Sequence, residues 1–129
     1  MNFTTYTHSY IGSEITWPIY KYGTLGLAKF NLYAYSKKIL NFCKLFGGRV
    51  FLFINKALIT QASAAIPAVP LYISLLYNKT RKSWTHENYI NQNLRLFYRL
   101  NMFERIKFSV VRLDDFEIKT STQFEIIFK

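Results

Sequence analysis

Basic side chains are the residues of this sequence most able to do chemistry. The 129 residues include seventeen Lys and Arg against seven Asp and Glu, a net charge of +10. An excess of this size favours a polyanionic partner, because Lys and Arg pair with phosphate groups and Arg can do so through two hydrogen bonds. A merely solubilising face is the alternative for each residue. The candidate RNA-binding residues are Lys37, Lys38, Lys44, Arg49, Lys79, Arg81, Lys82, Arg95 and Arg99.

Signatures of catalysis are missing from the sequence. His8 and His86 are far apart, and neither has neighbours at metal-ligand spacing. Gly47-Gly48 is not followed by the Gly-Lys-Ser/Thr of a phosphate loop. Cys43 is the single cysteine, which excludes an internal disulfide and a cysteine-cluster zinc site. We therefore predict that the protein is not an enzyme and has no metal, cofactor or small-molecule substrate.

A long uncharged segment, residues 57–78, allows two interpretations. Its length could span a bilayer of about 30 Å as one transmembrane helix. Pro67 and Pro70 near its middle favour instead two extended arms joined by a bend, and we expect both prolines to contact a partner. Trp84 and Tyr89 flank the basic loop beyond this segment. They could stack on unpaired bases, but contact with a neighbouring protein is the favoured role.

Hydrophobic periodicity predicts an α+β domain that positions these side chains. Residues 28–46 place apolar side chains on one helical face, and Gly47 is expected to end that helix in the left-handed conformation. Strands are expected at residues 14–22, from residue 49 towards 76, at 89–98 and at 124–128, with a second helix at 102–113.

Two right-handed crossovers in this order give a ferredoxin-like βαββαβ fold. The predicted domain has a four-stranded sheet, both helices on one face and a long β-hairpin at about residues 55–88. Residues 1–14 are expected to be an N-terminal extension, and residues 15–129 a single domain.

Short motifs fall in order along these elements, and on them the chain resembles the small-subunit ribosomal protein S-ten family, in its organellar form. The motifs cover residues 15–129, although the uncharged segment 57–78 departs from the family's proline-rich hairpin. They are Ile39, Lys44, Gly47 and Val50 at matching intervals, Leu94-Arg95-Leu96, Arg112-Leu113-Asp114 and the alternating residues 124–128.

The resemblance implies a structural constituent of the small ribosomal subunit head, which binds rRNA and neighbouring ribosomal proteins. Residues encoded by AT-rich codons dominate the composition, and no targeting segment is evident. Both features favour a mitochondrial ribosomal protein made inside the organelle, with membrane association not expected. The alternative is an accessory subunit of a respiratory complex in the mitochondrial inner membrane, with residues 57–78 as its transmembrane helix.

Overall fold

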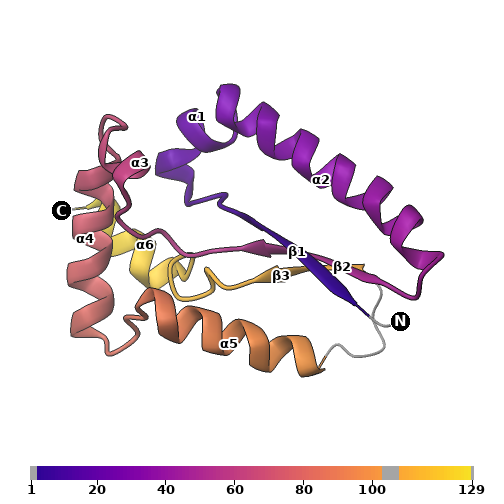
Figure 1. Cartoon of the computed structure of the whole chain (residues 1–129). Helices are drawn as coiled ribbons and strands as arrows, with labels where there is room; N and C mark the ends of the chain where they lie inside the picture. The colour runs from indigo at the N-terminus through magenta and orange to yellow at the C-terminus, as the bar shows by residue number, and fades with distance from the viewer. Residues whose placement is uncertain (1–2, 103–107, 129) are drawn as a thin grey trace.

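A three-stranded parallel sheet forms the centre of the computed structural model, which describes residues 3–102 and 108–128 (Figure 1). The strands are β1 (Thr4–Ser9), β2 (Arg49–Ile54) and β3 (Phe108–Arg112), in the order β1-β2-β3. β2 pairs in parallel with both neighbours. Its residues 50–54 are all buried, which is the pattern of a central parallel strand covered on both faces.

Helices cover both faces of the sheet. α2 (Thr24–Lys44) lies on one face and α5 (Tyr89–Met102) on the other (Figure 1). Side chains alternate along β2, so Val50 packs against Leu40 and Cys43 of α2. Phe51 and Phe53 point the other way and pack with α5 and β3 in the largest core cluster, whose members are Phe51, Phe53, Leu96, Leu100, Val111 and Leu113.

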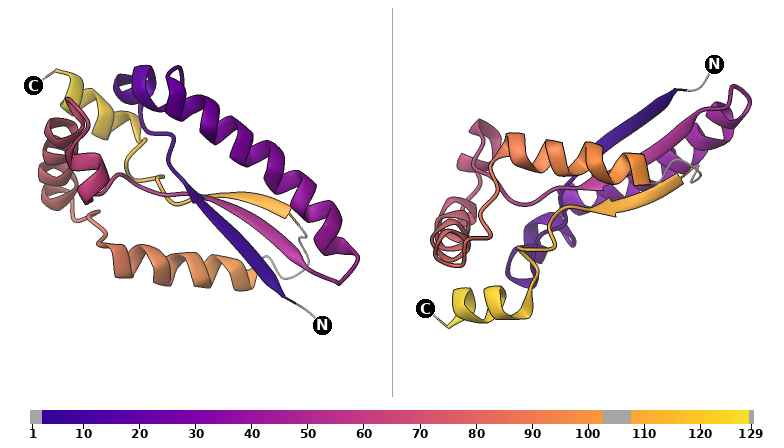
Figure 2. Two further views of the ribbon diagram at one scale, coloured as in Figure 1. Left: turned by 45° about the horizontal axis from the view of Figure 1, so that its top comes forward. Right: turned by 90° about the horizontal axis from the view of Figure 1, so that it is seen from below.

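The remaining helices gather beyond the carboxyl ends of the strands (Figure 2). They are the 3-10 turn η1 (Glu14–Thr16), α1 (Trp17–Tyr20), α3 (Gln61–Ala64), α4 (Val69–Lys82) and α6 (Thr120–Ile127). Tyr72, Ile73 and Leu76 of α4 pack with Ile126 of α6 in a second core cluster. This cluster packs at the carboxyl end of the sheet, where loops follow the strands.

The two crossovers of the sheet have opposite hands. The chain steps from β1 to β2 and then to β3 in the same direction, but the connecting helices α2 and α5 lie on opposite faces. Two right-handed crossovers in one direction would place both helices on the same face. One connection therefore departs from the usual rule, which is why that rule led to an incorrect layer order.

The predicted helix and strand around the glycine pair are confirmed. α2 spans residues 24–44 where 28–46 was expected, β2 spans 49–54 at the start of the expected strand, and Gly47 has a φ of 69°. Such a φ is the left-handed conformation that glycine adopts without steric cost. Leu40 and Cys43 of α2 are buried at helical spacing, although Ile39 and Phe42 are exposed, and the apolar residues of β2 form a continuous buried run.

The ferredoxin-like fold with a four-stranded sheet and a long hairpin is wrong. Residues 55–88 hold α3 and α4 instead of extended arms, and residues 14–22 hold η1 and α1. Residues 89–98 belong to α5, where Gln92, Leu96 and Leu100 are buried at a spacing of one helical turn. The apparent alternation around Leu94 was too short to distinguish a strand from a helix.

Three further elements differ from prediction or extend it. Residues 124–128 begin inside α6 rather than a strand, and the expected helix at 102–113 contains β3, with 103–107 outside the described residues. β1 lies within residues 1–14, and the division into extension and domain stays a prediction. Among the described residues, no helix is both long enough and apolar enough to cross a bilayer.

Candidate active site

A cavity of about 430 Å³ lies at the carboxyl ends of β1 and β2. In open α/β sheets, ligands bind in a crevice outside this edge, where loops and helix starts converge. The segments that follow β1 and β2 form its wall together with α1 and the first turns of α2. Its polar and aromatic lining includes His8, Ser9, Tyr10, Tyr20, Lys29 and Lys56.

Tyr20 and Lys29 are brought together by the tight turn between α1 and α2. Tyr20 ends α1, and Lys29 lies early in α2. Gly26 permits the turn, since a Cβ there would lie 2.0 Å from the carbonyl oxygen of Lys21. The Lys29 Nζ atom lies 5.5 Å from the centre of the Tyr20 ring. The pair therefore depends on a backbone approach that only glycine allows.

Tyr10 completes this group from the segment after β1. Its ring meets that of Tyr20 edge to face, with centroids 4.7 Å apart and planes at 90°. The Lys29 Nζ atom lies 5.7 Å from the Tyr10 ring centre. Three residues from three elements thus converge on one wall of the cavity.

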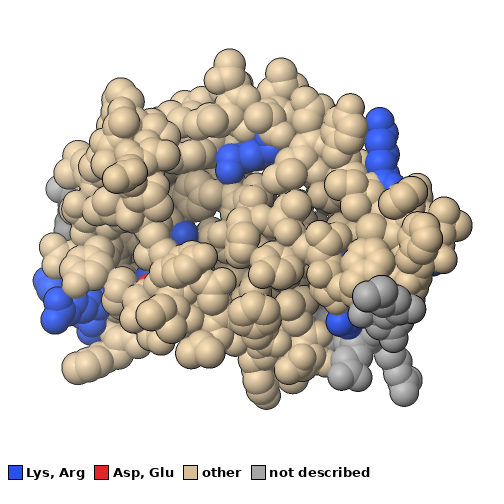
Figure 3. Space-filling view, in the orientation of Figure 1, with Lys and Arg blue, Asp and Glu red and all other residues tan. Residues whose placement is uncertain are grey.

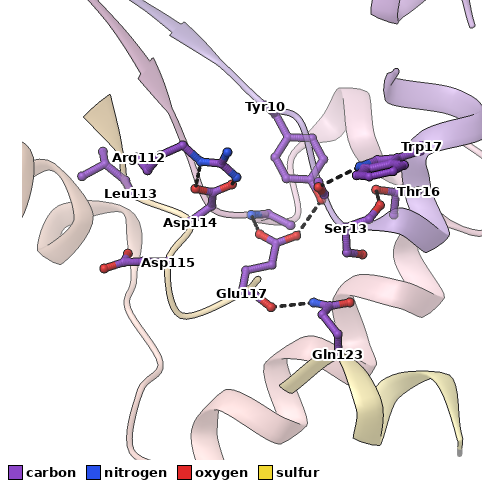
Figure 4. A network of polar contacts seen from close by, with 12 residues as sticks. Tyr10, Ser13, Thr16, Trp17, Arg112, Leu113, Asp114, Asp115, Glu117 and Gln123 are labelled. Atoms are coloured by element: carbon purple, nitrogen blue, oxygen red, sulfur yellow. Dashed lines mark hydrogen bonds and ion pairs between the residues drawn. The ribbon is translucent and has the colours of Figure 1, made fainter. Parts of the chain in front are cut away.

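The hydroxyls of the two tyrosines have different partners. Tyr10 donates to Glu117 Oε1 at 2.8 Å (Figure 4). The Tyr20 hydroxyl has no hydrogen-bond partner within the described part of the chain. Burial, with a contribution from Glu117, raises the pKa of Tyr20, and burial lowers the pKa of Lys29. Tyr20 is therefore a protonated donor beside a lysine, as a general acid requires.

A second lysine, Lys56, lies in the same wall and is 4% exposed. Its Nζ donates to the backbone oxygen of Glu87 at 3.3 Å and lies 3.4 Å from Nδ1 of His86. Burial lowers the pKa of Lys56, while the nearby Glu87 and Glu117 oppose that change. Two lysines in the cavity wall suit a ligand on which negative charge develops.

The nine basic residues proposed as RNA contacts do not gather at this cavity. Lys37, Lys38 and Lys44 are exposed along α2, and Lys37 and Lys38 lie over tyrosine rings. Arg49 begins β2 and donates to Thr4 Oγ1 at 2.9 Å.

The remaining basic residues lie on α4 and α5. Lys79, Arg81 and Lys82 occupy the last turn of α4. On the face shown in Figure 3, basic side chains gather near α4 and are otherwise scattered. Arg95 and Arg99 belong to α5 rather than a strand.

Arg95 and Arg99 are used within the fold. Arg95 bonds Asp115 at 2.5 Å and Glu87 at 2.6 Å, and Arg99 bonds Asp115 at 3.0 Å. These pairs tie α5 to the segment that follows β3. No observation tests the other basic residues as phosphate contacts, so that role stays a prediction.

The four residues proposed as partner contacts are spread over α4, α5 and the loops around them. Trp84 is 95% exposed, and Tyr89 begins α5 and lines the cavity. Pro67 lies in the turn before α4, and Pro70 lies in the first turn of that helix. Their contact with a partner also stays a prediction.

A parallel sheet with helices on both faces, and a tyrosine–lysine pair in a cavity at its carboxyl edge, defines an α/β protein with a candidate active site. Residues 1–102 match the family model for the trans-2-enoyl-CoA reductase catalytic region. The chain belongs to this family.

Bacterial relatives agree with this assignment. An NADH-dependent enoyl-[acyl-carrier-protein] reductase of Opitutus terrae is 46% identical over 126 residues, 95% of this chain and 32% of the relative. A trans-2-enoyl-CoA reductase [NADH] of Clostridium perfringens is 41% identical over 92% of this chain and 31% of the relative. The chain therefore spans about a third of the length of these relatives.

A solved structure agrees as well. The trans-2-enoyl-CoA reductase of Clostridium acetobutylicum in complex with NAD matches with a TM-score of 0.81 and 39% identity, over 96% of this chain and 33% of that one.

These findings overturn the ribosomal interpretation. The chain is not a member of the S-ten family, and its relatives are enzymes named for NADH and enoyl substrates, with no link to rRNA, ribosomal neighbours or a respiratory complex. Bacterial enoyl reductases likewise give no support to a place in the mitochondrial ribosome. The S-ten motifs misled because each is short, and Leu94-Arg95-Leu96 lies on a helix rather than a strand.

Tyr10, Tyr20, Lys29 and Lys56 were not predicted from the sequence as site residues, although Tyr89, which also lines the cavity, was named as a partner contact. Tyr20 and Lys29 are ordinary residue types, and only the turn at Gly23 and Gly26 hints that they meet. Glu117 is an acid between apolar neighbours, and nothing in the sequence connects it to Tyr10.

The reductant named for the relatives is NADH, which supplies hydride. The five glycines of this chain form no Gly-x-Gly-x-x-Gly run, and the described residues form no glycine-rich cradle for a diphosphate. The described residues of this chain therefore offer no glycine-rich site for the phosphates of a dinucleotide.

Proposed function

We propose that this chain carries the proton-donating part of an enoyl-thioester reductase site. The observation that carries the proposal is the Tyr20–Lys29 pair in the cavity at the strand ends. Family membership indicates the substrate class, a thioester with a conjugated carbon–carbon double bond. The residues of this chain account for binding the thioester end and for delivering a proton.

Reduction of such a double bond places negative charge on the thioester oxygen and requires a proton. Tyr20 is the donor in this proposal, because it lines the cavity, its pKa is raised, and its hydroxyl has no hydrogen-bond partner among the described residues. Lys29 stabilises the phenolate that remains after the proton has left, and Lys56 adds positive charge to the wall. Charges fixed before the reaction lower its barrier without reorganisation.

The test has two stages because the chain spans about a third of its relatives. First, the chain alone is assayed for NADH oxidation with trans-2-butenoyl-CoA and for binding of butanoyl-CoA. Then it replaces the matching third of the Clostridium acetobutylicum reductase, and the same oxidation is measured. We expect Tyr20→Phe to lower kcat/KM of the active form by about 10²-fold or more, the usual size of a general-acid contribution.

Tyr22→Phe is the matched control. Tyr22 lies two residues from Tyr20, is 71% exposed and does not line the cavity. The variant should keep full activity. Equal activity of Tyr20→Phe and Tyr22→Phe would reject Tyr20 as the donor. An inactive chimera that nevertheless folds would reject the assignment of this cavity to the reaction.

A further inference from the structure

A buried carboxylate, Glu117, lies behind the proposed site. It follows β3 and is 0% exposed. Its Oε1 accepts hydrogen bonds from the hydroxyls of Tyr10 and Tyr72, both at 2.8 Å. Its Oε2 accepts from the backbone N–H of Ala57 at 2.7 Å (Figure 4). Both oxygens are therefore engaged.

These contacts join the ends of all three strands. Tyr10 follows β1, Ala57 follows β2 and Glu117 itself follows β3. Tyr10 and Ala57 also line the cavity, so the carboxylate holds two of its walls from behind. Tyr72, the other donor to Oε1 of Glu117, belongs to α4. The Tyr72 hydroxyl also accepts hydrogen bonds from Ser13 at 3.0 Å and from Gln123 at 3.2 Å.

The set of partners fits an ionised carboxylate. Each partner can donate, and an ionised carboxylate only accepts. Burial and the nearby Asp114 raise the pKa of Glu117, while the bonds from Ala57, Tyr10 and Tyr72 oppose that rise. Asp114 is itself paired with Arg112 at 2.6 Å. A buried anion without such donors would cost several kcal/mol.

Tyr10 connects Glu117 to the proposed site around Tyr20. Its hydroxyl is committed to Glu117, and its ring contacts Tyr20 edge to face at 4.7 Å. Burial and the adjacent Glu117 raise the pKa of Tyr10, so it keeps its proton and continues to donate. The hydrogen bond therefore constrains the Tyr10 ring, and the Tyr20 ring packs against that ring next to Lys29.

We propose that Glu117 is a positioning residue for the proton donor: by fixing Tyr10, it sets the place of Tyr20 beside Lys29. The inference rests on the proposed role of Tyr20. It adds that a carboxylate outside the cavity determines the environment of that residue. If Glu117 had a purely structural role, its substitution would lower the stability of the chain without changing the environment of Tyr20 in particular.

The chain offers two matched variants. Tyr10→Phe and Tyr72→Phe each remove one donor to the same oxygen, Oε1, and keep the ring in place. Among the described residues, Tyr10 forms an aromatic ring contact with Tyr20, and Tyr72 does not. The full chain with isotope-labelled tyrosine is titrated by NMR, and Tyr20→Phe identifies the Tyr20 signal. Chemical denaturation of each variant is measured in parallel.

Three results are expected. Glu117→Gln should move the Tyr20 titration to lower pH, because it removes a negative charge that raises the pKa of Tyr20. Tyr10→Phe should change the Tyr20 chemical shift. Tyr72→Phe should lower stability as Tyr10→Phe does but leave the Tyr20 signal unchanged.

Either of two results would overturn the proposal. One is an unchanged Tyr20 signal in folded Glu117→Gln and Tyr10→Phe. The other is an equal change in Tyr72→Phe, which would reduce the effect to general packing. If Glu117→Gln does not fold, the comparison of the two Phe variants still decides. The NMR titration needs no catalytic turnover, so its failure is distinct from failure of Tyr20→Phe in the reductase assay.

Discussion

Two neighbouring regions at the carboxyl edge of the sheet use the same residue type in opposite ways. Around Tyr10 the hydroxyl groups of Tyr10 and Tyr72 and both oxygens of Glu117 are joined by hydrogen bonds in one sealed network. Tyr20 lines a cavity beside Lys29, and its hydroxyl has no hydrogen-bond partner among the described residues.

The difference indicates that the two regions have separate roles, one in the stability of the fold and the other in function. Buried polar groups in folded proteins are nearly always hydrogen-bonded, because an unpaired group loses its interaction with water. The sealed region obeys this rule and holds three strand ends together. In the open region, the proton donor Tyr20 and the cation Lys29 line the cavity, where a ligand can contact them. The sealed network therefore stabilises the fold, while the open pair is available for chemistry.

Glu117→Ala should have the largest effect on stability. The change leaves three donors without their acceptor, and each loss costs about 1–3 kcal/mol. The free energy of unfolding, measured by urea denaturation, should fall by about 3 kcal/mol or more. The control is Glu125→Ala, which breaks the half-exposed pair with Lys79 and should cost less than about 1 kcal/mol. Similar losses in the two variants would mean that the network is not a main support of the fold.

Lys29→Met tests the open region. We expect kcat/KM of the active form to fall by about 10²-fold, about 2.7 kcal/mol of barrier, because the phenolate of Tyr20 loses its cation. Stability should change by less than about 1 kcal/mol, since Lys29 is only half-buried. Lys21→Met is the control, because Lys21 lies over Trp17 outside the cavity. Unchanged NADH oxidation in Lys29→Met would remove the lysine from the mechanism.

Alkaline pH should weaken the sealed region. Burial and Glu117 raise the pKa of Tyr10 and Tyr72 in the folded chain, whereas an unfolded tyrosine titrates near about pH 10. Above that pH the unfolded state binds fewer protons than the folded state, so the free energy of unfolding falls as pH rises. The fall should approach about 1.4 kcal/mol per tyrosine per pH unit.

Tyr72→Phe supplies the check on this pH dependence. Denaturation midpoints measured from about pH 9 to 11.5 should fall less steeply in Tyr72→Phe than in the unaltered chain. Tyr22→Phe, at an exposed position, should leave the slope unchanged. Parallel slopes in all three proteins would show that the two buried tyrosines do not keep their protons in the fold.

Local patterns in the sequence correctly predicted a helix and a strand on either side of Gly47. The helical period before Gly47 and the apolar run after it identify α2 and β2, because each depends on neighbours in the chain. β1 was missed because its residues Thr4–Ser9 are polar at an edge and give no hydrophobic alternation. Which strands pair, and in which direction, depends on long-range packing that one sequence does not display.

The site could not be predicted for a similar reason. Tyr10 and Glu117 are 107 residues apart in sequence and meet only because the strand ends converge. Net charge favoured a polyanionic partner, but the rRNA that it suggested is contradicted by the family of the chain. Arg95 and Arg99, which looked like phosphate ligands, instead pair with Glu87 and Asp115. A count of charges does not reveal which of them the fold itself neutralises.

Gly47→Val should have the smallest effect and separates stability from function. Gly47 lies before β2, at the end of the sheet opposite the cavity, with a φ of 69°. A β-branched residue is strained in that conformation, so the variant should lose at least about 1 kcal/mol of stability. Gly47→Asn should lose less, because asparagine enters the left-handed region more readily. The Tyr20 titration should be the same in both, since the strain is far from the network of Glu117. An unchanged melting temperature in Gly47→Val would contradict the turn, and a shifted Tyr20 signal would show that strain at either end of the sheet reaches the open region.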